Sequence, residues 1–239
     1  MNHYLYAIVD GLPSGWRPPV AGLAGASVVP RRVDDLVVLG SLLDGVPAAG
    51  PRTLALHQDV VATLMDATAT LPFAYGMAVP AAGLPDWLAA HRIEVRGALA
   101  AVRGCVEMSV KLLRLDCAID RQLAARDRRR RPAGAPAGPG ARELQALADA
   151  IAERAALPRW RYRPAGSAGN VAAALAFLVP RTEVAGFLAR IAPVASHAAG
   201  VAVVPTGPWP PYSFVPEFDR TLPLRMPSQA FDGVGRRAG

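Results

Sequence analysis

Apolar residues follow two kinds of pattern along the chain, one typical of strands and one typical of helices, and stretches of the two kinds alternate. Three short apolar or β-branched runs are typical of strands: residues 3–9, 26–29 and 36–39. Pro51 then opens a helix that we expect to stop before Pro72, with an inward face made of Leu54, Val61, Leu64, Met65 and Thr68. Residues 73–79 are predicted to be extended, and Pro85 begins a second helix. This half of the pattern predicts an N-terminal α+β domain over residues 1–103.

From Cys105 onward the period changes to two, which is typical of a half-buried strand. One face of this strand carries Val106, Met108, Val110 and Leu112, and the other carries Glu107, Ser109 and Lys111. We expect Glu107 and Lys111 to form a cross-strand or surface pair.

The elements after this strand complete a known order. They are a helix at 143–156, a strand at 159–163 with arginines on one face and aromatics on the other, an apolar strand at 170–179 expected at the centre of the sheet, a helix at 183–195 and a strand at 201–204. The order βαββαβ is that of a ferredoxin-like domain, which we place at residues 104–215. A flexible Arg/Pro/Gly insertion is predicted at about 126–141, and residues 216–239 read as a loosely ordered tail.

The segment from Gly207 to Val215 is built from stiff residues and forms a Pro/aromatic extension of that domain. Its three prolines fix φ and remove backbone donors, so it cannot lie in the middle of a helix or sheet. Such a frame suits either a surface that a partner grips or a plug that seals the core, and both remain open. The same two alternatives hold for the segment Leu71–Gly76. The candidate residues for partner contact or core sealing are Trp209, Pro210, Pro211, Tyr212, Phe214, Pro72, Phe73 and Tyr75.

The segment GPWPPYSFV resembles the C-terminal signature of the gas vesicle GvpL/GvpF family, a G-P-x-P-P-Y-S-F pattern with Trp209 at its variable position. Other stretches resemble the family in the same order along the chain: Tyr4–Ala7, His57–Met65 with Leu71–Gly76, Gly104–Lys111, and Ala176–Val179. The likeness spans nearly the whole chain. It implies a ferredoxin-like fold for the second half.

The resemblance also implies a function and partners. Gas vesicles are hollow protein shells made mainly of a small, very hydrophobic subunit. A member of the family is expected to be a non-enzymatic accessory or minor structural protein that binds the shell subunit or other accessory proteins and helps to nucleate or complete the shell. The expected location is the cytoplasm and the gas vesicle.

Composition raises the question of a membrane protein, because hydrophobic residues make up 52% of the chain and the mean hydropathy is +0.23. Prolines and glycines interrupt the long uncharged stretches, so no unbroken apolar helix of about 20 residues is expected. The N-terminus has no basic region before its apolar run, which favours a cytoplasmic protein. Of the net charge of +7, +4 comes from Arg126–Arg131, which reads as a solvated linker.

The sequence offers no pattern for a metal site, a cofactor or catalysis. The four histidines lie far apart, and no nucleophile elbow or glycine-rich phosphate loop is present. His57 and Asp59 lie two apart in a predicted helix and do not face each other, so we read them as part of its N-terminal turn. One alternative is a ferredoxin-like protein that binds a small molecule or acts as an enzyme. An RNA-binding module is a weaker one, because the aromatic pattern of RNA-binding sheets is missing.

Overall fold

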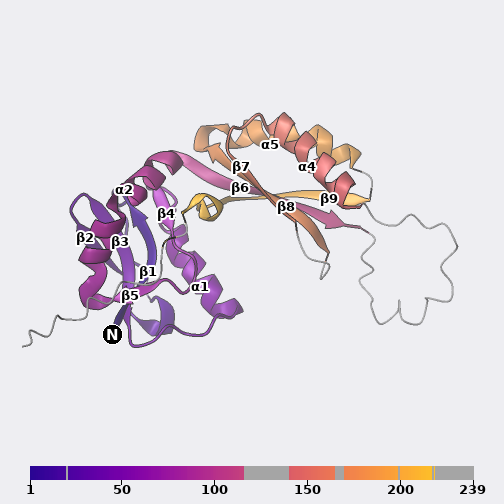
Figure 1. Cartoon of the computed structure of the whole chain (residues 1–239). Helices are drawn as coiled ribbons and strands as arrows, with labels where there is room; N and C mark the ends of the chain where they lie inside the picture. Colours follow the sequence, from indigo (N-terminus) through magenta and orange to yellow (C-terminus); the bar gives the residue numbers. More distant parts are fainter. Residues whose placement is uncertain (20, 116–139, 165–169, 199, 217, 219–239) are drawn as a thin grey trace, which may run out of the picture.

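A computed structural model describes residues 1–19, 21–115, 140–164, 170–198, 200–216 and 218 of the 239-residue chain. These residues form a mixed α and β structure with two antiparallel sheets (Figure 1). The predicted insertion at about 126–141 falls almost wholly outside the described residues, as does the tail after residue 218.

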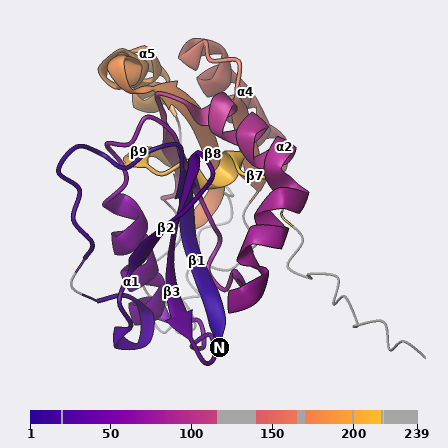
Figure 2. The ribbon, with the colours of Figure 1, turned by 90° about the vertical axis from the view of Figure 1, so that its left-hand side faces the viewer.

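The first sheet is built by the N-terminal third of the chain. Its strands are β1 (Asn2–Val9), β2 (Val29–Val33), β3 (Leu36–Leu43), β4 (Thr70–Pro72) and β5 (Ala78–Pro80). They follow the order β2-β3-β1-β4, and β5 also pairs with β1. The helices α1 (Pro51–Ala62) and α2 (Leu84–Val102) lie on opposite sides of this sheet (Figure 2). Because both of its faces are covered, β1 is apolar along almost its whole length.

An irregularity in β1 distributes its side chains between two cores. The pairing with β3 shifts between Leu5 and Ala7, so Tyr6 is an extra residue in the strand. Leu5 and Ile8 join a core cluster with α2, whereas Tyr4, Tyr6, Ala7 and Val9 join one with α1.

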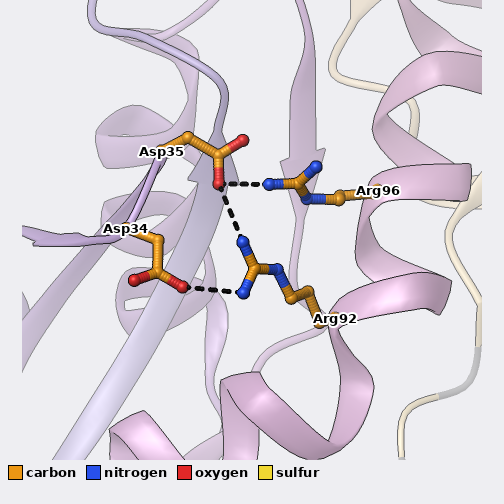
Figure 3. Close-up of polar contacts among 4 residues, drawn as sticks. All are labelled: Asp34, Asp35, Arg92 and Arg96. Atoms are coloured by element: carbon orange, nitrogen blue, oxygen red, sulfur yellow. Dashed lines mark hydrogen bonds and ion pairs between the residues drawn. The ribbon is translucent and has the colours of Figure 1, made fainter.

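Ion pairs connect α2 to the turn between β2 and β3 (Figure 3). Arg92 contacts Asp34 at 3.1 Å and Asp35 at 3.8 Å, and Arg96 contacts Asp35 at 2.6 Å. The hydrogen bond and charge of Arg96 lower the pKa of Asp35. All four side chains are about half exposed, so solvent screens these contacts.

The second sheet follows α2 directly. Its strands are β6 (Cys105–Arg114), β7 (Trp160–Pro164), β8 (Val171–Pro180) and β9 (Val201–Trp209), in the order β7-β8-β6-β9. The helices α4 (Ala141–Ala155) and α5 (Val184–His197) cover one face (Figure 1). Four short 3-10 helices complete the described elements: η1 (Leu23–Gly25), η2 (Ala81–Gly83), η3 (Arg181–Glu183) and η4 (Tyr212–Phe214). The prediction that the apolar strand lies at the sheet centre is confirmed, because β8 lies between β7 and β6.

The predicted end of the last strand is wrong. We expected it to end at Val204, but β9 continues to Trp209 through Pro205 and Pro208. The strand lies at the sheet edge, where proline is tolerated because only one side of the strand takes part in the ladder. The pairing with β6 also shifts between Glu107 and Ser109, which accommodates the extra residues.

Boundaries in the first half are also partly wrong. α1 ends at Ala62, and the N–H groups of Thr63, Leu64 and Met65 then donate to carbonyls three residues back, which tightens the chain into turns. The buried face of α1 therefore differs from the predicted one. Leu54, predicted to face inward, is 39% exposed, whereas Val60, which is not among the predicted inward residues, is buried.

Two of the predicted extended runs are shorter than expected. Within residues 26–29 only Val29 is in a strand, because the chain before it makes the η1 turn, where Gly22 donates its N–H to Ala26 O. Residues 73–77 form a turn with Gly76 at φ 95°, and β5 begins at Ala78.

The two sheets share one core cluster. Ala176 and Leu178 of β8, together with Phe214, belong to the same cluster as the inward residues of α2 and β4. Arginines join the halves as well: Arg181 donates to Ala67 O at 2.9 Å, and Arg159 donates to Ala101 O. The second sheet therefore packs against the first through the face that α4 and α5 leave free.

Candidate functional site

The Pro/aromatic segment is anchored to the second sheet by a buried carboxylate. Glu107, in β6, is 8% exposed. Its two oxygens accept hydrogen bonds from Ser213, one from the backbone N–H at 2.7 Å and one from Oγ–H at 2.8 Å. These bonds fix η4 beside the strand pair formed by β6 and β9.

Burial raises the pKa of Glu107, and the two hydrogen bonds from Ser213 partly offset that effect. Burial also raises the pKa of the Tyr212 hydroxyl, and the nearby Glu107 charge adds to it. The Tyr212 hydroxyl has no hydrogen-bond partner within the described residues. The expected pairing of Glu107 with Lys111 is therefore wrong, because Glu107 turns inward to Ser213 while Lys111 stays exposed.

The predicted residues of the segment divide by burial. Pro210, Pro211 and Phe214 are buried, and Tyr212 is partly buried. Trp209 differs from them: its side chain is 49% exposed, and its indole N–H donates to Thr206 Oγ1 at 3.3 Å. Only the first aromatic residue of the segment thus presents a large apolar surface to solvent.

A crevice of about 1270 Å³ opens between η4 and the turn after β4. Pro72, Phe73, Tyr212 and Phe214 line it together with Ala74, Met77, Arg161, Arg163, Ser213, Val215, Pro216 and Phe218. Candidate residues about 140 positions apart in the sequence therefore meet at this crevice. Trp209, Pro210, Pro211 and Tyr75 do not line the crevice.

Two arginines of the second sheet lie over the Phe214 ring. The guanidinium carbon of Arg161 is 5.6 Å from the ring centroid and that of Arg159 is 5.9 Å away. These contacts are cation–π interactions, and of the two arginines Arg161 also lines the crevice.

Tyr75 belongs to a neighbouring aromatic cluster around His57. The Tyr75 hydroxyl donates to Pro47 O at 2.9 Å. The His57 ring lies 5.8 Å from the Tyr75 ring, 5.7 Å from that of Tyr4 and 6.4 Å from that of Tyr212. The cluster links the Pro/aromatic segment to α1.

Hydrogen bonds settle the tautomer of His57. Nε2 lies 3.0 Å from Phe73 O, a carbonyl that can only accept, so Nε2 carries the proton. Nδ1 then accepts from the Tyr4 hydroxyl at 2.7 Å. Burial lowers the pKa of His57. Our assignment of His57 and Asp59 to the N-terminal turn of the helix is wrong, because α1 begins at Pro51.

Sequence reasoning missed Glu107 and His57 as the polar residues that hold this site. The only local signal for Glu107 is a carboxylate between the apolar residues Val106 and Met108 of a strand. Within the described part of the chain, no three His, Cys, Asp or Glu side chains gather closely enough to hold a metal ion. No described helix is long and apolar enough to cross a bilayer.

Comparison with solved structures shows where this fold occurs. The gas vesicle protein GvpF of Anabaena sp. PCC7120 superposes with a TM-score of 0.67 at 16% identity, over 90% of this chain and 98% of that one. GvpF of Microcystis aeruginosa gives a TM-score of 0.65 at 16% identity, over 89% of this chain and 98% of that one. At these identities the likeness concerns the fold.

Comparison with protein families is more specific. No curated protein sequence matches the chain. The family described as "Gas vesicle synthesis protein GvpL/GvpF" matches residues 2–157 and 139–216, which together span nearly all of the described structure. The resemblance carried by Gly207–Val215 and the earlier motifs is confirmed, and the chain belongs to the GvpL/GvpF family of gas vesicle synthesis proteins.

Proposed function

We propose that this protein is a non-enzymatic accessory or minor structural protein of gas vesicle assembly. It binds the small hydrophobic shell subunit, other accessory proteins or both, in the cytoplasm and at the growing vesicle, and aids nucleation or completion of the shell. Family membership supports the gas vesicle role.

We further assign two domains, an N-terminal α+β domain at residues 1–103 and a ferredoxin-like domain at 104–215. The order β7-β8-β6-β9 supports the second assignment, because the chain enters this antiparallel sheet in the order strand, helix, two strands, helix, strand. The shared cluster around Phe214 supports a fixed contact between the two.

The observation that carries the partner contact is the exposure of Trp209 beside a buried anchor. Phe214 is 6% exposed and seals the shared core, whereas Trp209 is 49% exposed on an edge strand. Prolines on both sides hold Trp209 in place, so an apolar partner could bind it with little loss of conformational entropy. The segment then has both roles: Phe214 seals the core, and Trp209 provides a docking surface.

Co-purification with the co-expressed shell subunit tests this proposal. The informative variant is Trp209→Ala, and the matched control is Ile93→Ala, which removes a 91% exposed apolar side chain from α2. We expect the wild type and Ile93→Ala to retain the shell subunit and Trp209→Ala to lose most of it while its melting temperature stays nearly unchanged.

Phe214→Ala separates the two roles. Emptying a buried aromatic site should lower the free energy of unfolding by about 3–5 kcal/mol, whereas Trp209→Ala should cost about 1 kcal/mol or less. Equal retention of the shell subunit by Trp209→Ala and wild type would refute docking through Trp209. No retention by the wild type, with either the shell subunit or the other accessory proteins, would refute the proposed binding role.

A further inference from the structure

One face of the second sheet is left free by α4 and α5, and its composition is uneven. On the central strands this face carries small or short side chains, because Ser109 of β6 pairs with Ala176 of β8. Arg161 and Arg163 of the edge strand β7 stand opposite Ala176 and Ala174, and Lys111 stands opposite Ala174 from the other side. Basic side chains thus flank a strip of short side chains, of which Ala176 is buried in the core cluster shared with the first sheet.

Arg161 and Arg163 also line the crevice beside η4. Both side chains are exposed, and within the described residues neither forms an ion pair with a carboxylate. The nearest acid in the site, Glu107, is buried, and its two oxygens are bound by Ser213. Neither guanidinium group is therefore paired directly with a carboxylate of the described residues, and both groups line the crevice. The charge of Arg163 does act on Glu107, where it partly offsets the rise in pKa that burial causes.

We propose that this crevice and its arginine margin bind an acidic segment of a partner protein, one that presents two carboxylates beside an apolar side chain. The inference rests on the proposed function, since it supplies the chemistry by which an accessory protein recognises a partner. It adds a second contact to the one assigned to Trp209.

The spacing of the arginines fits such a segment. Two residues along a strand span roughly 7 Å, and carboxylates two residues apart on an extended peptide have the same spacing. Guanidinium groups bind carboxylates through charge-assisted, often paired hydrogen bonds. Among the described residues, Arg161 makes one hydrogen bond, from NH1 to Trp160 O at 3.2 Å, which leaves most of its donors for a ligand. Phe73, Met77 and Val215 line the crevice and provide apolar contact for the residue between the carboxylates.

A protein ligand fits this face better than a nucleic acid. Sheets that bind single strands stack bases on exposed aromatic rings of the central strands. Here the corresponding positions on the free face are Ser109, Ala174 and Ala176, and the ring nearest the arginines, Phe214, is buried. Charge without stacking rings favours carboxylates over bases.

Fluorescence anisotropy of a labelled peptide with alternating aspartate and leucine tests the inference on the full chain. A peptide with asparagine in place of aspartate and a single-stranded RNA of 12 nucleotides serve as the comparison probes. The β7 variant, Arg161→Gln/Arg163→Gln, removes the two arginines that line the crevice. The β2 variant, Arg31→Gln/Arg32→Gln, removes the same charge from exposed positions of β2. We expect the aspartate peptide to bind the wild type and the β2 variant equally, and to bind the β7 variant at least about ten-fold more weakly.

Any one of four results would overturn the inference. They are no binding of the aspartate peptide, equal binding of the asparagine peptide, tighter binding of RNA, and binding of the aspartate peptide by the β7 variant as tight as by the wild type. The variants are also used in co-purification with the shell subunit and accessory proteins. If the β7 variant loses the peptide yet retains the shell subunit through Trp209, both assignments stand. If the peptide results overturn the inference while the wild type still retains a partner, only the crevice assignment fails.

Discussion

Glu107 and Ser213 lie 106 residues apart and are joined by two hydrogen bonds of 2.7 and 2.8 Å. Glu107 is also paired in register with Trp209 across β6 and β9. Residue 107 thus contacts both ends of the change from an exposed edge strand to a buried turn, through its backbone register at Trp209 and through its carboxylate at Ser213. Trp209 remains outside and Phe214 enters the shared core because Glu107 holds the chain between them.

Replacing Glu107 should loosen this segment. Glu107→Ala leaves the Ser213 N–H without its partner and removes two bonds to a charged group, so we expect a loss of about 2–4 kcal/mol in the free energy of unfolding. Glu107→Gln keeps one acceptor and should cost less. Urea unfolding measures both, and amide hydrogen exchange at Ser213 and Phe214 should quicken in the alanine variant. Lys111→Ala, an exposed change on the same strand face, is the control and should cost about 0.5 kcal/mol or less.

Gly207 is required where β9 passes Glu107. Its φ is 124°, and an added Cβ would lie 2.9 Å from Glu107 O and 3.0 Å from Met108 Sδ. Gly207→Ala should therefore cost about 2 kcal/mol or more in the free energy of unfolding. Gly97→Ala is the matched control, because Gly97 lies in α2 with nothing within 4 Å of the added Cβ. That change should stabilise the protein by about 0.5–1 kcal/mol. Similar unfolding curves for the two variants would contradict the required conformation at Gly207.

Regular elements of this fold can be predicted from the sequence, because a local period encodes them. The alternation after Cys105 predicts β6, and the apolar run at 170–179 predicts the central strand β8. A strand that is buried on both faces carries a nearly continuous run of apolar residues. Glu107 fits the polar positions of this alternation, and nothing local shows that it is buried, because its partner Ser213 is near only after the sheet has closed.

The candidate site could be predicted only in part for the same reason. The prolines and rings of the Pro/aromatic segment mark it as stiff, and its aromatic character is a property of the local sequence. Which ring is buried is decided by the meeting of Phe214 with α2 and β4. His57 likewise depends on Tyr4 and on the Phe73 carbonyl, both contributed by other elements.

The ion pairs of Asp34 and Asp35 with Arg92 and Arg96 should contribute little despite their short distances. The side chains are 48–62% exposed, so water and salt screen them. Arg92→Gln/Arg96→Gln should lower the melting temperature by no more than about 3 °C at low salt, and the difference should vanish at about 1 M NaCl. A large loss of melting temperature that does not depend on salt would mean that these arginines position α2 through contacts other than the ion pairs.

His57 should make the stability of the protein sensitive to mild acid. Burial lowers the pKa of His57 below its ordinary value of 6.5, so the unfolded chain takes up a proton on this ring before the folded protein does. The free energy of unfolding should therefore fall as the pH decreases through 6.5, and this contribution should level off below the lowered pKa. His3, also buried and with a lowered pKa, adds a loss of the same sign.

His57→Gln isolates the contribution of His57, because an amide can still accept from Tyr4 and donate to Phe73 O but does not titrate. The variant should be less stable than wild type at pH 7 by about 1–3 kcal/mol, since the bond geometry is poorer. The gap should narrow between pH 7 and 5, because the wild type loses its His57 contribution and the variant has none to lose. Urea unfolding at half-unit steps of pH measures both curves. Parallel curves would show that folding does not lower the pKa of His57, and the buried, Nε2-protonated ring would then not be the acid-sensitive element.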